Sequence, residues 1–440
     1  MSPDSDAREF VGLSPARLRE RIADEIRRNG PIPFSRYMEL CLYEPELGYY
    51  SRVREQFGKA GDFYTSSDVH AVFGRLLARQ FEEMWRALDS PDRLDVIELG
   101  PGRGLFARDV LDWSAKHFPD FARVLHYSVV EQSPHLRQKL RERLSDHIAA
   151  GKCDVFDSLE SGASAFNKGR QEDVMSGVSG RGAALAAPSP DVSSCHSEQA
   201  LAREESALPP ASTAPSGNLI LFANEFFDAL PVEVIDHRGA LRIDIEHGNF
   251  RETFAAPSAA EVEFLGRYGV RPEPGERVEA PLAALAWMDR IASVFQDRRG
   301  FLVLIDYGYT REEQLAGRHR DTVMSYRQHT ASASPYEAPG EQDITAHVNF
   351  TALRTRGIDH GLDLLALLTQ SQFLLGIGEE TQFADAFQDC RLPQEQAKVA
   401  LQLKHLISPS GMGETFQVLL MSHNVAKEKA MTLSGLKLAH

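Results

Sequence analysis

The chain has 440 residues, 42% of them hydrophobic, which is enough to bury one large core or two modest ones. Its formal net charge of −15 argues against nonspecific nucleic-acid binding, because that binding needs Lys and Arg to displace phosphate counterions. The four cysteines lie far apart, no HExxH motif occurs and no apolar run is long enough for a bilayer, so we expect neither a metal site nor a membrane span.

The N-terminal stretch is acidic and has neither an apolar signal core nor an Arg-rich transit pattern, so we expect a cytoplasmic protein. Residues 14–30 are predicted to form an amphipathic helix, with Ser14 and Pro15 at its start and Gly30 after its end. A second helix is predicted over residues 69–84, where apolar side chains recur at helical spacing. Residues 1–90 are therefore expected to be a helical extension that packs on the core.

From residue 94 onward, apolar strands alternate with helical segments, which indicates an α/β fold with a parallel sheet covered on both faces. The strand candidates are residues 94–99, 125–131, 153–156, 218–223, 301–305, 362–367 and 416–421.

The same pattern divides the chain into regions. Residues 91–160 and 218–232 are expected to form a Rossmann-like core, and residues 301–440 the rest of the sheet. Residues 233–300 are expected to be a cap that includes an exposed hairpin over the carboxyl edge of the sheet. Residues 161–217 contain 22 Ser or Ala and only eight large apolar side chains, so we predict a disordered insertion there.

A glycine-rich loop follows the first strand of the core, in the stretch DVIELGPGRGLFARDV. Its glycines stand at alternate positions: Gly100, Gly102 and Gly104. The dinucleotide fingerprint GxGxxG/A does not fit when it is started at Gly100, because its sixth position is then Leu105. Started at Gly102 it fits formally, but Glu98 and Pro101 then stand at the strand end, where apolar residues are expected. The pattern ExGxGxG fits, with Glu98 placed to engage the charged end of S-adenosylmethionine (SAM), so the loop favours SAM over NAD.

Carboxylates also end two later strands. Glu131 closes the next strand, where it can accept hydrogen bonds from both hydroxyls of a ribose, which suits SAM and NAD alike. Asn224, Glu225 and Asp228 follow the fourth strand, at the edge where such folds bind substrate. If residues 224–229 form a helical turn, Glu225 and Asp228 share a face; alternatively, Asn224 caps a helix whose positive end favours both carboxylates.

Six segments make the sequence similar to one known family. They are PIPFSRYMELCLYEPELGYYSR, GDFYTSSDVHAVFG, VIELGPGRG, NEFFDALPVEV, LIDYGY and PGEQDITAHVNF, in this order. Together they resemble the MidA family of SAM-dependent methyltransferases, which includes a mitochondrial complex I assembly factor with protein-arginine methyltransferase activity. The resemblance spans residues 31–423 apart from the insertion at 161–217.

The resemblance implies a Rossmann-like class I methyltransferase core with SAM as cofactor and a protein as substrate, and the partner that the family implies is a subunit of NADH:ubiquinone oxidoreductase. The residues that it implies for SAM binding are Glu98, Gly100, Gly102, Gly104, Glu131, Gly61, Asp62 and Thr65. The last three belong to a loop that would close over the cofactor. Family members often continue this loop as TSPE, whereas this chain has Ser67 and Asp68 in place of Pro and Glu.

Methylation of arginine would need acidic side chains, because a guanidinium is protonated at ordinary pH and is a poor nucleophile. Paired carboxylates can localise its charge on one nitrogen and orient another, and Glu225 and Asp228 are the candidates, with Asn224 lining the site. His347 is a candidate to accept a proton or contact substrate, although a lone His is more often structural. Two other functions stay open: methyl transfer to another nucleophile, and a SAM-binding assembly chaperone without turnover.

Overall fold

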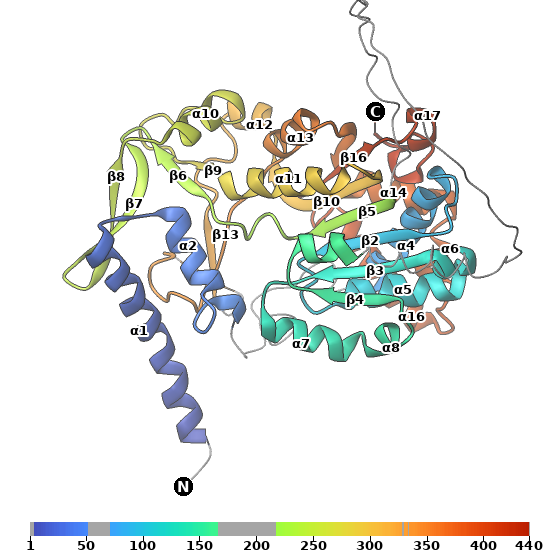
Figure 1. Ribbon diagram of the computed structural model, residues 1–440, viewed down its shortest axis with the longest axis horizontal. Helices are drawn as coiled ribbons and strands as arrows, with labels where there is room; N and C mark the ends of the chain where they lie inside the picture. The colour runs from blue at the N-terminus through green and yellow to red at the C-terminus, as the bar shows by residue number, and fades with distance from the viewer. Residues whose placement is uncertain (1–3, 52–70, 166–216, 328–329, 333, 440) are drawn as a thin grey trace, which may run out of the picture.

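A computed structural model describes residues 4–51, 71–165, 217–327, 330–332 and 334–439. These residues form two lobes that lie side by side (Figure 1). The larger lobe is built on an eight-stranded sheet, and the smaller lobe on a five-stranded sheet. The arrows of β3 and β5 point toward the smaller lobe, so the carboxyl ends of these strands lie where the lobes meet (Figure 1).

The main sheet has its glycine-loop strand near the centre. Its strands, in spatial order, are β15 (Asp363–Thr369), β16 (Phe416–His423), β10 (Arg299–Tyr309), β5 (Asn218–Asn224), β2 (Leu94–Leu99), β3 (Leu125–Val130) and β4 (Cys153–Phe156), and β14 (Val348–Asn349) adds to β10. The strands from β10 to β4 are parallel, but β16 runs antiparallel to both its neighbours. The expected parallel sheet is therefore present from β10 to β4, and β16 makes the whole sheet mixed, which the sequence did not indicate because a run of buried residues reads the same in either direction.

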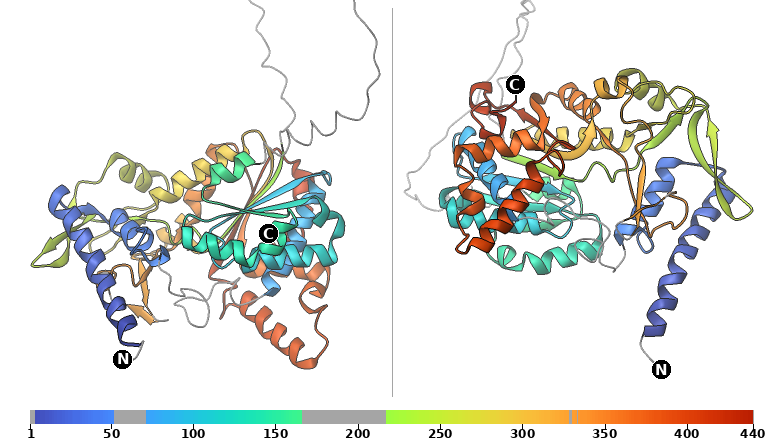
Figure 2. Two further views of the ribbon diagram at one scale, coloured as in Figure 1. Left: turned by 60° about the horizontal axis from the view of Figure 1, so that its bottom comes forward. Right: turned by 180° about the vertical axis from the view of Figure 1, so that it is seen from behind.

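Helices cover both faces of this sheet, which explains the continuous apolar runs. Along β5, Ile220 and Phe222 belong to one hydrophobic cluster, while Leu219 and Leu221 belong to another on the opposite face. The first face is covered by α4 (Ala71–Ala87), α5 (Leu105–His117), α14 (Gln370–Glu380) and α16 (Pro393–Ile407), and the second by α11 (Leu282–Phe295) and α13 (Phe350–Asp359). Of the C-terminal helices, α14 and α16 lie against the face that carries the blue α4 (Figure 2).

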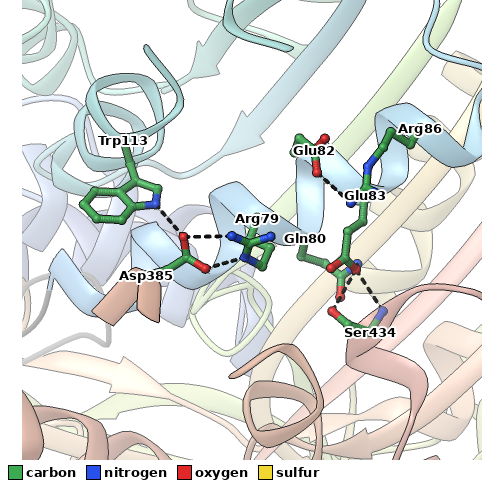
Figure 3. Close-up of polar contacts among 8 residues, drawn as sticks. All are labelled: Arg79, Gln80, Glu82, Glu83, Arg86, Trp113, Asp385 and Ser434. Atoms are coloured by element: carbon green, nitrogen blue, oxygen red, sulfur yellow. Dashed lines mark hydrogen bonds and ion pairs between the residues drawn. The ribbon is translucent and has the colours of Figure 1, made fainter. Parts of the chain in front are cut away.

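Polar contacts tie the C-terminal segments to α4 (Figure 3). The Arg79 guanidinium pairs with buried Asp385, which also accepts a 3.1 Å hydrogen bond from the Trp113 indole N–H. Further along α4, the Gln80 side-chain oxygen accepts the backbone N–H of Gly435 at 2.9 Å. The end of the chain is thus part of the core that supports the main sheet.

The smaller lobe contains most of the N-terminal segment. Its sheet orders β1 (Ile32–Pro33), β7 (Gly239–Glu246), β6 (Glu233–Asp236) and β9 (Val278–Ala280), with β8 (Asn249–Ala255) on β7 and with α1 (Asp4–Asn29) and α2 (Phe34–Tyr43) packed against it. Because β1 pairs with β7, these first elements pack on the smaller sheet. Among the described residues of 1–90, only those of α4 form a helix that packs on the main sheet. The first helix begins at Asp4 rather than at Ser14, since a Ser-Pro pair favours a helix start but does not impose one.

One further boundary differs from the sequence prediction. Residues 159–165 are helical, and Leu159 and Ala163, one turn apart, are buried, so the predicted insertion does not begin at residue 161. The rest of the predicted insertion, residues 166–216, lies outside the described residues. The expected hairpin is present as β7 and β8, which pair antiparallel in the smaller lobe.

Candidate functional site

A cavity of about 760 Å³ lies between the lobes, at the carboxyl ends of β2, β3 and β5. Its volume falls within the range of ~300–1,000 Å³ that is typical of small-molecule sites. One half is lined by the glycine loop and the segment after β3, and the other half by α2, the short helix η1 (Tyr49–Ser51), the turn after β5 and α11. The cavity can therefore hold two small molecules or groups side by side, one against each set of lining residues.

The three glycines of the loop all adopt left-handed backbone conformations, with φ of 62° at Gly100, 50° at Gly102 and 70° at Gly104. A Cβ atom on Gly100 would stand 2.8 Å from the Phe226 ring, and one on Gly104 would stand 2.6 Å from Leu140. Gly100 and Gly102 line the cavity, whereas Gly104 lies at the N-cap of α5 and is not among the lining residues. Gly104 therefore serves the packing of the loop, and the other two leave room for a ligand.

Glu98 ends β2 at the cavity wall and is almost completely buried. The Tyr127 hydroxyl donates a 2.9 Å hydrogen bond to its carboxyl group. Burial raises the pKa of Glu98 to about 8, and the bond from Tyr127 offsets part of that rise. At neutral pH Glu98 is thus mainly protonated, unless a cation beside it stabilises the ionised form.

Glu131 lies directly after β3 and also lines the cavity. Its backbone N–H donates to the Phe156 carbonyl at 3.0 Å, and its carboxylate accepts the Ser133 N–H at 2.7 Å. Burial raises its pKa to about 7. A carboxylate has about four lone-pair positions, so one bond to Ser133 leaves it able to accept two ribose hydroxyls.

The turn after β5 separates the two carboxylates that we expected to act as a pair. Asn224 and Glu225 line the cavity, and the Asn224 amide donates a 3.1 Å hydrogen bond to the Glu225 carboxylate. Asp228 is not among the lining residues; it is buried and accepts a 2.7 Å hydrogen bond from the Tyr307 hydroxyl. Burial raises the pKa of Asp228 to about 6.

The predicted helical turn over residues 224–229 does not form, because the backbone N–H groups of this segment bond to β10 instead. Glu225 donates to the Ile305 carbonyl at 2.9 Å and has a φ of 50°, which is unusual for a residue other than glycine. Phe227 and Asp228 donate to the Asp306 carboxylate at 3.0 and 3.3 Å. Glu225 and Asp228 consequently do not share a face.

His347 lies outside the cavity lining. Its Nδ1 stands 3.1 Å from Nδ1 of His319, and its ring meets the Tyr307 ring edge-on at 5.3 Å. Burial, together with the neighbouring His319, lowers the pKa of His347 to about 4. His347 is therefore a neutral packing partner of Tyr307, and Tyr307 itself holds Asp228 rather than lining the cavity.

Several lining residues were not predicted from the sequence. Phe226 and Trp287 meet at 5.0 Å in an edge-to-face contact on one wall. Tyr43 and Tyr50 stack at 5.6 Å on another, with their hydroxyls bonded to the Ala229 carbonyl and to Asp343. The repeated tyrosines of ELGYY and the paired phenylalanines of NEFFD were visible as motifs, but nothing in their spacing assigned them to a cavity.

Three expectations concern absent features or residues that the structure does not describe. Gly61, Asp62 and Thr65 lie outside the described residues. Within the described part of the chain, no three His, Cys, Asp or Glu side chains group in a way that could hold a metal ion. Of the helices described, none combines the length and the apolar character that crossing a bilayer requires.

Residues 76–368 match the family described as "Putative S-adenosyl-L-methionine-dependent methyltransferase". The chain is 28% identical over 430 residues to the protein arginine methyltransferase NDUFAF7 homolog, mitochondrial, of Drosophila melanogaster, over 92% of this chain and 84% of that protein. It is 26% identical over 398 residues to the Homo sapiens protein arginine methyltransferase NDUFAF7, mitochondrial, and the match covers 89% of this chain and 80% of that protein. The expected cytoplasmic location is wrong on this comparison, because these curated relatives are mitochondrial proteins.

Among solved structures, a Burkholderia thailandensis protein with bound S-adenosyl-homocysteine superposes with a TM-score of 0.71 at 25% identity, covering 100% of this chain and 97% of that one. S-Adenosyl-homocysteine is SAM without its methyl group, and the cavity of this protein is lined by the glycine loop and by the carboxyl groups of Glu98 and Glu131. SAM is therefore the cofactor. Because the match at residues 76–368 covers more than half of the chain, the protein belongs to this family of S-adenosyl-L-methionine-dependent methyltransferases.

Proposed function

We propose that the protein methylates an arginine side chain of a protein substrate. The observation that carries this proposal is an acidic group at the inner wall of the cavity: Glu225 lines it, and Asp228 and Asp306 lie buried behind. SAM supplies an activated methyl group when it is bound. The names of the mitochondrial relatives, which are protein arginine methyltransferases, support the same substrate class.

Glu225 and Asn224 form the part of the site that a guanidinium would contact. The Glu225 carboxylate can accept two N–H groups, and Asn224 holds it in place through the 3.1 Å hydrogen bond. The Asn224 side-chain oxygen is buried and has no hydrogen-bond partner among the described residues. A guanidinium has five N–H donors in one plane, so it can satisfy this oxygen and the carboxylate together.

Asp228 acts from behind rather than by contact, since Tyr307 holds it outside the cavity lining. Its charge, like that of Glu225, favours a cation at the inner wall and helps to localise the positive charge on the nitrogens nearest to it. The nitrogen that receives the methyl group must lose a proton. Glu225, which lines the cavity, is placed to accept that proton, whereas Asp228 and His347 lie outside the cavity lining.

Two more carboxylates line the cavity, those of Glu39 and Glu233, and each forms an ion pair, with Arg36 and Arg242 respectively. The protein as a whole carries a formal net charge of −15, which is compatible with a basic protein substrate. We include in the proposal a subunit of NADH:ubiquinone oxidoreductase as the protein substrate, which rests on the resemblance of the six sequence segments to the MidA family. Methyl-proteomics of cells with and without the protein would identify the substrate.

The test of arginine methylation compares Glu225→Gln with the wild type. Purified protein, methyl-labelled SAM and arginine-containing peptides should give methylarginine by mass spectrometry. Glu225→Gln keeps the shape and removes the charge, so transfer should fall by ~10²-fold while the Kd for SAM changes by less than about threefold. Glu279→Gln, at a buried carboxyl group outside the cavity lining, serves as the matched control and should retain most of the activity.

Two results would contradict the proposal. Methyl transfer to a residue other than arginine would mean that the site serves another nucleophile. Binding of SAM without methylation of any protein would mean that the protein acts as a chaperone.

A further inference from the structure

Asp306, in the segment LIDYGY, is the most deeply buried carboxylate of the acidic group. It lies on β10, one position after the residue that pairs with the end of β5, Ile305 opposite Asn224. Its relative exposure is 1%, in a strand whose preceding five residues are all apolar. A carboxylate at such a position needs hydrogen bonds to compensate for the loss of water.

Three backbone N–H groups provide this compensation. One carboxylate oxygen accepts from Phe227 at 3.0 Å and from Asp228 at 3.3 Å, and the other accepts from Tyr307 at 2.9 Å. Two of these donors belong to the turn after β5, about 80 residues earlier in the sequence. Asp306 therefore joins that turn to the neighbouring strand.

This set of hydrogen bonds from Phe227 and Asp228 to Asp306, called the clamp below, fixes the backbone that follows Glu225. Another hydrogen bond to β10 fixes the backbone at Glu225 itself. The N–H of Glu225 itself donates to the Ile305 carbonyl at 2.9 Å, and Glu225 keeps a φ of 50° between the two attachments. A left-handed conformation at a residue other than glycine persists only where its surroundings hold it. The direction of the Glu225 side chain thus depends on Asp306.

Whether Asp306 is charged depends on what occupies the cavity. Burial raises its pKa well above the usual range, and the neighbouring Asp228 and Glu225 raise it further. Carboxyl groups that repel one another in this way hold protons in the empty site, and a bound cation relieves the repulsion. A guanidinium at Glu225 is therefore stabilised by the whole group of three carboxylates, and its binding releases protons.

We propose that Asp306 is a positioning residue of the methyl-transfer site, which aims Glu225 into the cavity and adds, from behind, negative charge that favours a guanidinium. This inference rests on the proposed arginine methylation. It assigns to the aspartate of LIDYGY a role in recognising the substrate cation rather than in binding SAM.

The experiment compares Asp306→Asn with the wild type, with S-adenosyl-homocysteine bound to both. Asparagine has nearly the same shape, but it offers one acceptor oxygen where the aspartate offers two. The probe is N-ethylguanidinium, and N-ethylurea, which has a similar shape without the charge, is the control probe. Calorimetry in buffers of different ionisation enthalpy measures both the affinity and the protons released.

The affinity for N-ethylguanidinium should fall by about tenfold or more, because a unit charge close to the site in a low-dielectric interior is removed. Proton release should diminish as well, while the affinities for N-ethylurea and SAM stay unchanged. With an arginine peptide, KM should rise and kcat should fall. Glu279→Gln is the matched control: Glu279 is equally buried and accepts two bonds from Thr322, but it lies outside the cavity lining, so none of these quantities should change.

The outcomes separate the inference from the proposed function. A wild type that neither binds N-ethylguanidinium nor methylates arginine refutes the proposed function. A wild type that does both, together with an Asp306→Asn variant that binds the cation equally well, overturns the inference alone. Should the variant not fold, hydrogen exchange on the wild type decides: the amides of Phe227 and Asp228 should exchange as slowly as those of β10, and fast exchange there would refute the clamp.

Discussion

Replacing Glu98 by Gln should make the stability of the ligand-free protein less dependent on pH. Glu98 lies at the end of β2, where its carboxyl group is buried and accepts the Tyr127 hydroxyl at 2.9 Å. Glutamine has nearly the same shape and can accept the same bond, but it does not titrate. The substitution therefore isolates the free energy that is linked to the proton on Glu98.

The magnitude follows from the raised pKa of Glu98. In the folded protein this pKa is about 8, whereas its ordinary value is 4.5, so the folded state keeps a proton that the unfolded state has released. A group whose pKa is raised by folding contributes its full stability below the unfolded pKa and loses it as the pH rises through the folded pKa. Between about pH 5 and about pH 8.5, the wild type should lose about 4 kcal/mol relative to Glu98→Gln, at about 1.4 kcal/mol per pKa unit.

Urea unfolding at a series of pH values, without SAM, measures this difference. Near pH 5 the two proteins should unfold at similar urea concentrations, and above pH 8 the variant should be the more stable one. Tyr127→Phe is a second informative variant, because the bond from Tyr127 lowers the pKa of Glu98. Without this bond, the loss of unfolding free energy with rising pH should continue to a higher pH than in the wild type. Parallel stability profiles for wild type and Glu98→Gln would refute the reasoning, since Glu98 would then be ionised in the fold.

Two further substitutions test the glycine loop and the C-terminal attachment. Gly100→Ala should weaken SAM binding by about tenfold or more in calorimetry, because the added Cβ would stand 2.8 Å from Phe226 at a φ of 62°. Gly151→Ala is its control, with a φ of 67° and nothing within 4 Å, so it should reduce stability slightly and leave SAM binding intact; equal effects would show that strain alone acts. Gln80→Ala should cost about 1–3 kcal/mol of unfolding free energy in urea, because the buried N–H of Gly435 loses its acceptor, and an unchanged midpoint would contradict this.

The glycine loop and the strands could be predicted because their signals are local. Left-handed conformations favour glycine, and all three loop glycines adopt them. Buried strands read as short apolar runs, and the predicted strand at residues 153–156 coincides with β4, while the one at 94–99 coincides with β2. Glu98 and Glu131 follow directly from these two signals, since each stands at the end of a strand beside the cavity.

The turn after β5 could not be predicted because its conformation depends on distant partners. The segment NEFFD has residues that suit a helix start, but its N–H groups pair with Ile305 and Asp306, which become neighbours only when β5 and β10 align. The placement of Asp228 behind the cavity follows from the same contacts. Likewise, the first helices join the smaller lobe because two residues of β1 pair with β7, some 200 residues later.

The two halves of the cavity are held in place by one contact between them. Phe226, in the turn that carries Glu225, packs so closely on the glycine loop that Gly100 has no room for a Cβ atom. Strands β2 and β5, which carry the loop and the turn, are adjacent and parallel in the sheet. The glycine loop and the turn that carries Glu225 therefore share one rigid support, and methyl transfer depends on the positioning of its reactants more than on acid–base strength. In the proposed reaction, Glu225, Asp228 and Asp306 accordingly belong to the same sheet as the strand that carries the glycine loop, since β5 pairs with both β2 and β10.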